Sequence, residues 1–522
     1  MLKRRIMPVG LLLLVILSIV LPLPQTMRAA AAQPDQVLLL YDSLAADTPQ
    51  AGNVEALERL LAGFGVQVTA MSFDRYAAGQ LSQAHKLIIV RNADDLPAWP
   101  QAFLTDLDSY SGSLLQIGGQ PLAALQRKLQ LDIVQTGGAD TISLQIGPFA
   151  QAAITTSGIP YIVGHAGSAY GAITSEMRHR SSPYGVAQDG YAYIPFMVQG
   201  NLTELAASYV LKDWLAIAAP SHYYVLFNGI YPFSDLDLLN EMADRLYDAG
   251  IPFIASVQPV LDHLDYPAAL RYLETLKHVQ SRNGSIVVNA PVVASTIVQD
   301  IHVLQTQMEA FLDALAGYGI APLGVGAEMY WSYDQHYTQD GLRFFDSSIV
   351  FPNEKVMYRA PTDISTAFAS HVYTVKAGEL TPYMAPRQAL APLPMDTALV
   401  YPFPQNRSEL EATMQSLLAD WSTFADYKNT EHTVRTAHNE IGSRSGHLQI
   451  NGAAIVMNNN IQEIQSEHTY VQENEKSFKT LFTVQNNIFI VLILTTLLLF
   501  AAFLVIGYRL YRQKYRHTGR AL

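Results

Sequence analysis

The sequence predicts an α/β protein with two parallel-sheet domains and one C-terminal transmembrane helix, and three observations support this prediction. Short apolar runs alternate with amphipathic stretches of helical length over residues 33–130 and again over residues 220–428, which is typical of parallel sheets with crossover helices. The 522 residues are 49% hydrophobic, which is enough for a large core. Residues 488–508 carry no charge and are long enough to cross a bilayer.

The two ends of the chain predict segments outside the folded body. Residues 1–31 combine basic residues, an apolar run and an alanine-rich end, as a secretory signal peptide does, with an uncleaved anchor as the alternative. Residues 509–522 contain five basic residues and no acidic residue. By the positive-inside rule this tail is predicted to be cytoplasmic and the body of the protein extracellular, held at the cell membrane by one helix.

The composition of the exported part limits its partners. Nine of the 33 basic residues lie in the signal segment and the tail, so 24 basic residues face all 45 acidic ones, a net charge of about −21. This balance disfavours nucleic acid and anionic lipid headgroups and leaves neutral or cationic polymers as candidates. The chain contains no cysteine, which excludes thiolate nucleophiles and cysteine-based zinc sites.

Residues 33–130 predict an α/β domain. Strands are predicted at Gln36–Tyr41, Val66–Ala70, Lys86–Val90 and Ser113–Ile117, with helices between them at 53–65 and 101–110. The alternation predicts a parallel sheet of flavodoxin-like or amidotransferase-like type, and Asn53 is predicted to cap the first helix. Asp42 and Gly118-Gly119 follow strands and are candidate ligand positions, with a cap and a turn as the alternative.

Residues 131–215 predict a β-rich insertion and a linker. Over residues 131–199 the helical periodicity is lost, and short apolar runs are divided by Gly, Ser and Pro. This pattern predicts β hairpins. A helix is predicted at Ala206–Leu215, leading into the next domain.

Residues 220–428 predict a second series of strand and helix units. The runs Val225–Asp235 and Ser285–Val293 begin as buried strands and stop at small or polar residues. Between them a helix after Ser234, a strand at Pro252–Val257 and a helix at Pro267–Ser281 complete a β-α-β-α-β pattern. Further elements are predicted at Asp300–Leu315, Ile320–Val325, Ser347–Phe351, His371–Val375, Thr397–Tyr401 and Asn406–Phe424.

Three segments of this second series resemble the polysaccharide deacetylase superfamily, in particular its poorly characterised branch of exported proteins. They are Tyr-Pro-Phe-Ser-Asp at 231–235, Gly-Ile-Pro-Phe-Ile-Ala-Ser-Val-Gln-Pro at 250–259 and Gln-Ser-Arg-Asn-Gly-Ser-Ile-Val-Val at 280–288. The resemblance implies a distorted (β/α) barrel with an Asp-Asp pair after the first strand, a general base followed by a metal ligand. It also implies a His-x-x-x-His after the third strand that completes the metal site.

The chain departs from that family pattern at every matching position. The Asp-Asp pair falls on Asn228 and Gly229, and the His-x-x-x-His falls on Asn289 and Val293. An amide is no base near neutral pH, and glycine and valine offer a metal no side-chain donor. The resemblance therefore implies a barrel without catalytic residues at the family positions and without a metal cofactor.

Other residues near these positions are candidate groove or sugar contacts, because aromatic faces stack on sugar rings. They are Tyr231, Asp235, Glu328, Tyr330 and Trp331. Ordinary packing is the alternative for the aromatic residues, and capping of a helix is the alternative for Asp235.

A relocated metal site is a second interpretation of the same region. Glu328, Asp334 and His336 lie close together in sequence, and a set of two carboxylates and one histidine is adequate for zinc or another divalent metal. The protein would then be an active deacetylase of N-acetyl hexosamine polymers with rebuilt ligands.

Residues 429–487 predict a solvated connector, over Thr430–Gly446, and a helical stalk that continues into the membrane helix. The sequence as a whole predicts a non-catalytic polysaccharide-binding or scaffold protein of the cell envelope, with an envelope polysaccharide or the exopolysaccharide machinery as its partner. The alternatives are the active metal-dependent deacetylase and a protein-interaction domain of a membrane complex.

Overall fold

The computed structural model describes residues 36–93, 98–291, 301–333, 342–353, 365–367, 370, 372–385, 390–419, 423–457, 462, 464 and 478–516. They belong to two compact units, Met1–Ile464 and Gln465–Leu522. The predicted signal peptide lies outside the described residues, as do Val293, Asp334 and His336.

The first part of the larger unit contains an eight-stranded sheet in the order β19-β2-β1-β3-β4-β13-β12-β9. Its parallel strands are β1 (Gln36–Tyr41), β2 (Gln67–Ser72), β3 (Lys86–Val90), β4 (Ser113–Ile117) and β13 (Tyr191–Ile194). Strands β12 (Gly185–Gln188) and β9 (Ser168–Tyr170) extend the sheet in antiparallel pairing. The helices of this part are α2 (Asn53–Gly63), α3 (Gln101–Ser109), α4 (Ala123–Leu129) and α5 (Leu202–Trp214). The predicted parallel sheet is confirmed.

The apolar run of β1 explains its place inside the sheet. Side chains alternate between the two faces of a strand, and here both faces are covered. Val37, Leu39 and Tyr41 belong to one apolar cluster, whereas Leu38 and Leu40 belong to a second cluster on the opposite face. A strand buried on both faces is continuously apolar, which is why this run could be predicted from the sequence.

Helix α2 begins differently from the prediction. Gly52, with φ of 81°, occupies the cap position, and Asn53 is the first helical residue. The Asn53 side chain donates to the carbonyl of Met197 at 2.6 Å and accepts from the amide of Gln199 at 2.9 Å. Asn53 therefore ties α2 to the chain before α5 instead of capping the helix, which corrects the sequence-based expectation.

Two small antiparallel sheets occupy the segment in which β hairpins were expected. One has the order β11-β10-β6-β7, and the other pairs β5 with β8. Their strands are β5 (Asp132–Gln135), β6 (Ala139–Ile146), β7 (Phe149–Ser157), β8 (Pro160–Gly164), β10 (Ala172–Ser175) and β11 (Arg180–Ser182).

Asp140 is the charged centre of this insertion. It is 2% exposed, accepts hydrogen bonds from the hydroxyls of Tyr161 at 2.8 Å and Ser175 at 2.9 Å, and pairs with Arg178 at 2.8 Å. Burial by itself would raise the pKa of Asp140, but these hydrogen bonds and the guanidinium outweigh burial and hold the pKa below its usual 3.8. The carboxylate therefore stays ionised and joins β6 to its neighbours.

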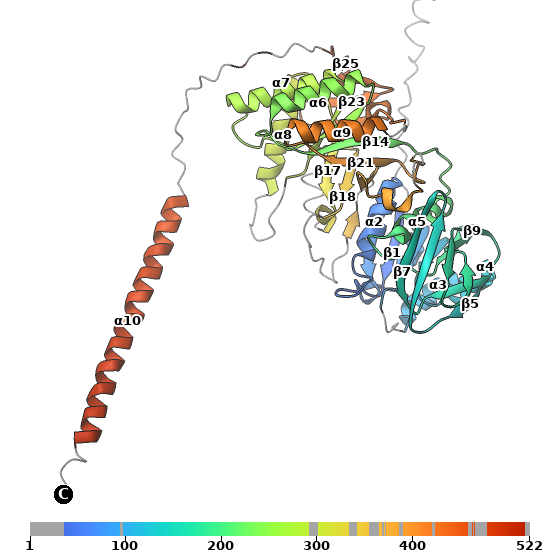
Figure 1. Ribbon diagram of the computed structural model, residues 1–522, viewed down its shortest axis with the longest axis horizontal. Coiled ribbons are helices and arrows are strands. Elements are labelled where there is room, and N and C mark those ends of the chain that lie inside the picture. Colours follow the sequence, from blue (N-terminus) through green and yellow to red (C-terminus); the bar gives the residue numbers. More distant parts are fainter. Residues whose placement is uncertain are drawn as a thin grey trace, which may run out of the picture. The chain divides into compact units, whose positions relative to one another are not determined.

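The second part of the larger unit is a closed barrel of seven parallel strands. In barrel order the strands are β14 (Tyr223–Ile230), β15 (Phe253–Val257), β16 (Gly284–Asn289), β17 (Pro322–Glu328), β18 (Ser348–Phe351), β20 (Tyr373–Lys376) and β21 (Thr397–Pro402). Helices α6 (Leu236–Asp248), α7 (Pro267–Ser281), α8 (Ile301–Gly317) and α9 (Arg407–Ala419) lie around the strands (Figure 1). The predicted (β/α) pattern is confirmed at this level.

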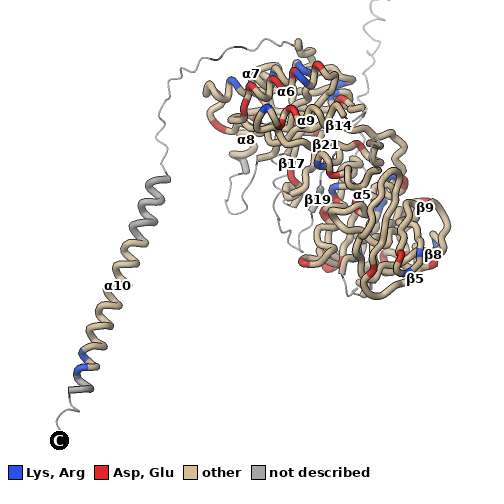
Figure 2. The backbone as a smooth tube through the Cα atoms, viewed as in Figure 1, with Lys and Arg blue, Asp and Glu red and all other residues tan. Residues whose placement is uncertain are grey.

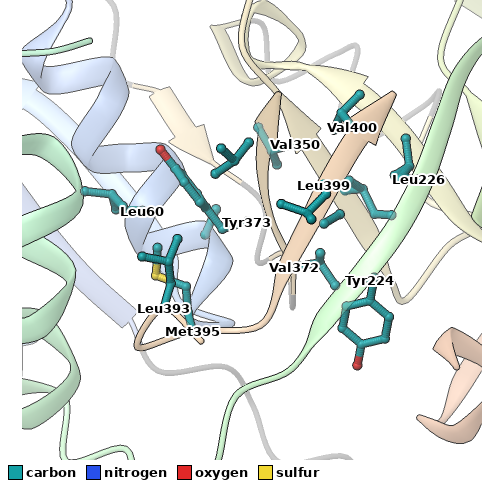
Figure 3. Packing of buried hydrophobic residues seen from close by; sticks show 14 of the residues in the cluster. Leu60, Tyr224, Leu226, Val350, Val372, Tyr373, Leu393, Met395, Leu399 and Val400 are labelled. Carbon is teal, nitrogen blue, oxygen red and sulfur yellow. The ribbon is translucent and has the colours of Figure 1, made fainter. Parts of the chain in front are cut away.

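The barrel and the N-terminal sheet share one apolar junction. Helix α2 contacts β18 and β20, and Leu60 of α2 lies in the same cluster as Tyr373 of β20. Figure 3 shows the Tyr373 ring beside α2, with Leu393 and Met395 close to it. Because the cluster is continuous, the N-terminal sheet is fixed against the barrel.

A short strand strengthens this junction. Strand β19 (Ser365–Ala367) follows β18 in the chain, yet it pairs antiparallel with β2 of the N-terminal sheet. Next to it, Gly65 donates its amide to the carbonyl of Ser370 and Ser370 donates its amide to the carbonyl of Ala62, both at 2.9 Å. The chain of the barrel therefore supplies the edge of the other sheet.

The segment predicted to be a solvated connector is instead a small sheet, so that prediction is wrong. Its antiparallel strands are β22 (His432–Arg435), β23 (Glu440–Arg444), β24 (His447–Ile450) and β25 (Ala453–Ala454). Val434, Ile441 and Leu448 are buried in the core that the barrel uses. The hairpins therefore cover part of the barrel.

The smaller unit contains helix α10 (Phe478–Arg516). Among the described residues, one helical segment, Phe489–Arg512, is long and apolar enough to cross a membrane. In Figure 2 the part of α10 that is not grey shows no acidic residue, and its basic residues lie towards the C-terminal end. This agrees with the predicted membrane anchor.

Candidate functional site

A cavity of about 510 Å³ opens where the barrel strands end. All seven strands contribute residues at or just after their carboxyl ends, where ligand sites of parallel α/β folds occur. The N-terminal part covers the same cavity with Arg59 of α2 and with Gln199, Glu204 and their neighbours at the start of α5. The cavity is thus formed by both parts of the larger unit, and its size is in the range of small-molecule sites.

Three amide side chains line one side of the cavity, on three neighbouring strands. Asn228 lies in β14, Gln258 directly follows β15, and Asn289 ends β16. Among the described residues, no group bonds the side chains of Asn228 and Gln258, and none accepts from the Nδ2 of Asn289. Each amide is both a donor and an acceptor, so this wall offers both kinds of hydrogen bond to a ligand.

The Asn289 amide is held in one orientation. Asn289 is 9% exposed, and its Oδ1 accepts a hydrogen bond of 2.5 Å from the hydroxyl of Ser256. A Cβ at Gly326, on the next strand, would come within 2.4 Å of that Oδ1. Ser256 therefore fixes the amide, and the absence of a side chain at Gly326 makes room for it.

Asn228 reaches the cavity because β14 is irregular at this point. The pairing of β14 with β15 shifts register between Phe227 and Ile230, and Gly229 has φ of 75°. A residue with a side chain would be strained in that conformation. Bulges of this kind redirect side chains at the rims of barrels, and here the bulge leaves Asn228 half-buried at the cavity.

A buried charge network forms the side of the cavity that faces the N-terminal part. The Tyr373 hydroxyl donates to Glu204 at 2.8 Å, and the amide of Gly200 donates to the same carboxylate at 2.9 Å. Arg59 donates to the carbonyl of Thr374 at 2.9 Å, lies 3.9 Å from Glu204 and stacks over Tyr373. Burial, with the nearby Glu204 charge, holds the pKa of Tyr373 well above its usual 10, so the phenol remains a hydrogen-bond donor.

The loop after β14 carries an aromatic pair at the cavity. Tyr231 lines the cavity and is 41% exposed, and Phe233 is 83% exposed. Their rings are stacked with centroids 5.0 Å apart. Asp235, a candidate contact, instead caps α6 by accepting from the amide of Leu238 at 3.0 Å, which is the alternative that the sequence left open.

The candidates Glu328, Tyr330 and Trp331, at and after the end of β17, differ in where their side chains lie. Trp331 is 1% exposed and packs with Val325, Ala327 and Leu342, which is the packing alternative that the sequence left open. Its indole nitrogen lies 3.2 Å from the hydroxyl of Tyr330. Neither aromatic residue is among the described residues that line the cavity, whereas Glu328, at the end of β17, does line it.

The residues at the family positions do not fit a divalent metal. Asn228, Gly229 and Asn289 meet at one cavity, but the two amides are poor ligands for zinc and glycine provides no side-chain donor. Within the described ranges, no group of three or more His, Asp or Glu side chains could hold a metal ion. The relocated set of Glu328, Asp334 and His336 has two members outside those ranges.

The candidate Asp42 in the N-terminal part has a structural role. Asp42 pairs with Arg91 at 3.1 Å and accepts from the amide of Asn92 at 2.8 Å, and Arg91 stacks over Trp99. Burial raises the pKa of the Asp42 carboxyl and lowers that of the Arg91 guanidinium. The pair joins the ends of β1 and β3, as the capping alternative predicted.

Sequence reasoning missed the part of the site that comes from outside the barrel. Arg59, Glu204 and Tyr373 carry no local motif, and they lie up to 314 positions apart in the chain. Gln258 was within reach of prediction, because it follows a strand at the same edge as Asn228 and Asn289. Comparison with known protein families and with curated proteins gives no match for this chain.

Proposed function

We propose that this protein is exported, anchored in the membrane by its C-terminal helix, and binds a neutral polysaccharide of the cell envelope in the barrel cavity without changing it chemically. The observation that carries the proposal is the wall formed by Asn228, Gln258 and Asn289, whose amide groups have hydrogen-bonding capacity that no described residue uses. Sugar hydroxyl and acetamido groups donate and accept hydrogen bonds, as these amides do.

The architecture supports this proposal in two ways. A closed parallel barrel with its cavity at the carboxyl ends agrees with a deacetylase-like barrel whose metal ligands have been replaced. The order β2-β1-β3-β4-β13 supports a flavodoxin-like type for the N-terminal sheet. Fold and site chemistry are separable, so a barrel of this type can keep a ligand cavity without a catalytic centre.

The proposal also includes the location of the protein. Residues 488–508 would cross the cell membrane, residues 509–522 would lie in the cytoplasm, and the larger unit would lie outside. The excess of acidic residues in the exported part supports a neutral partner and argues against nucleic acid or an anionic polymer.

Binding of the full-length chain, in detergent micelles, to a glycan array tests the proposal. Calorimetric titration with a glycan that binds then measures the effect of Asn228→Ala, Gln258→Ala and Asn289→Ala. Each change is expected to weaken binding by about 3- to 10-fold, the value of one or two hydrogen bonds. Gln36→Ala removes an exposed amide at the start of β1 and is expected to leave the affinity unchanged.

Three outcomes would contradict the proposal. Stoichiometric bound zinc together with acetate release from N-acetyl hexosamine oligomers would instead support the active deacetylase. Co-purification with a membrane complex and an array without any bound glycan would support the interaction domain. Equal affinity of the three cavity variants and the unsubstituted chain would show that the glycan binds elsewhere.

A further inference from the structure

The loop after β14 holds an exposed aromatic ring in a fixed position. Ser234 donates its amide to the carbonyl of Tyr231 at 3.0 Å, and the Ser234 hydroxyl accepts from the amide of Tyr231 at 2.9 Å. Pro232 is the second residue of this turn, where its restricted φ favours the turn conformation. Phe233 follows it, so its ring is displayed from a backbone that two hydrogen bonds and a proline make rigid.

The Phe233 ring continues a surface that begins inside the cavity. The rings of Tyr231 and Phe233 are nearly parallel, with an interplanar angle of 18° and centroids 5.0 Å apart, which is an offset stack. Tyr231 lines the cavity, whereas Phe233 is 83% exposed. The pair therefore leads from the cavity to the outside, and most of the outer ring is free to contact a ligand.

We propose that the pair forms a second sugar position, at which Phe233 stacks on the unit next to the one bound in the cavity. This inference rests on the proposed function and extends it, because the protein would then hold two neighbouring units of the neutral polysaccharide, one in the cavity and one on Phe233. A ring that is already ordered contributes stacking without the entropic cost of fixing a mobile side chain.

The surroundings of the pair favour a neutral sugar chain over other occupants. Asp235 and Asp237 follow it in the chain and are exposed, so an anionic polymer would be repelled. The exposed apolar area consists of two rings on one turn, which is far smaller than the core of a stable protein interface. A sugar ring presents an apolar face of a size that one aromatic ring can cover.

The test compares N-acetylglucosamine with its linear tetramer, titrated calorimetrically into the full-length chain in detergent micelles. Phe233→Ala is expected to weaken tetramer binding by about 3- to 10-fold, the range for a stacking interaction, and to leave monomer binding unchanged. Phe233→Trp is expected to preserve tetramer binding because it keeps an aromatic face. Tyr247→Ala removes a half-exposed ring from α6 and is expected to change neither affinity.

The inference would be overturned by equal weakening of both sugars in Phe233→Ala, or by no weakening of either. It would also be overturned if the unsubstituted chain bound neither sugar. In that case the glycan array decides about the proposed function. If a glycan binds on the array, sugar binding in the cavity stands and only the second sugar position is rejected. If none binds, the proposed function fails as well. Circular dichroism of each variant confirms that the fold is intact.

Discussion

The Tyr373 hydroxyl, on strand β20 of the barrel, donates a 2.8 Å hydrogen bond to Glu204 on helix α5 of the N-terminal part. Both side chains are buried at the junction. Because the donor belongs to the barrel and the acceptor to the N-terminal part, this bond contributes to the stability of the junction and shapes the cavity wall.

Tyr373→Phe is expected to lower the free energy of unfolding by about 1–3 kcal/mol, because a buried carboxylate loses one of its donors. Urea unfolding of the full-length chain in detergent, followed by tryptophan fluorescence, measures the change. Tyr247→Phe removes the hydroxyl of a half-exposed tyrosine and is expected to cost less than about 0.5 kcal/mol. Equal stability of Tyr373→Phe and the unsubstituted chain would contradict a role for this bond.

Gly326→Ala is expected to weaken glycan binding and to destabilise the barrel. The new Cβ would lie 2.4 Å from Oδ1 of Asn289 and 2.8 Å from the ring of Phe351, and overpacking of this kind typically costs about 1–3 kcal/mol. Calorimetric titration and thermal unfolding measure the two effects.

Gly317→Ala is the matched control for this change. Gly317 ends α8, and a Cβ there would meet no atom within 4 Å. The substitution is expected to leave binding unchanged and to stabilise the protein by about 0.4–1 kcal/mol, since alanine has fewer conformations in the unfolded chain. Unchanged binding in both variants would show that the position of Asn289 does not matter.

Asp140→Asn is expected to destabilise the protein at neutral pH by about 1.5–3 kcal/mol, the contribution of hydrogen bonds to a charged group. The folded-state pKa of Asp140 lies below its usual 3.8, so its contribution is complete above pH 3.8. It is then lost as the pH falls through the lower folded-state value. The stability difference between the variant and the unsubstituted chain should therefore disappear in strong acid.

Denaturant unfolding at a series of pH values from 7 downwards measures this linkage. Asp132→Asn, which changes an exposed carboxylate on β5 of the same insertion, is expected to have little effect at any pH. A constant difference between Asp140→Asn and the unsubstituted chain across the series would contradict the role given to the ionised carboxylate.

The absence of cysteine allows the membrane topology to be tested cleanly, because any introduced thiol is the only one. Gln449→Cys lies on an exposed position of β24, and Thr518→Cys lies in the basic tail. A membrane-impermeant maleimide is expected to label Gln449→Cys in intact cells and Thr518→Cys only after permeabilisation. Labelling of the tail in intact cells would reverse the proposed orientation.

The sequence was sufficient to predict the bounds of strands and helices that carry a clear local pattern. Strands β1, β3 and β4 match their predicted bounds, because each is a continuous apolar run. Helix α7 also matches, because its proline lies at the first helical position. The three described amide and glycine positions of the family motif were predicted to share one site, and they line one cavity. That prediction came from the resemblance of the surrounding segments to the deacetylase motif.

Tertiary contacts decide what the local sequence left open or concealed. For Trp331 the sequence allowed a binding surface or ordinary packing, and the fold places it beside Val325 and Leu342. The strands β22–β25 are short, and each of the first three contributes one buried apolar residue, Val434, Ile441 and Leu448. Charged neighbours concealed this pattern in the sequence. Neither segment contains a local pattern that indicates which other part of the protein packs against it.

The pairing of β19 with β2 has a consequence for biogenesis. Translation from the N-terminus produces β2 almost 300 residues before the strand that covers its edge, since β19 occupies Ser365–Ala367. Until β19 has been synthesised, the backbone N–H and C=O groups along that edge of β2 have no partner strand and can pair with another chain. The interval between the synthesis of the two strands is therefore a period in which this edge of the newborn protein is open to aggregation.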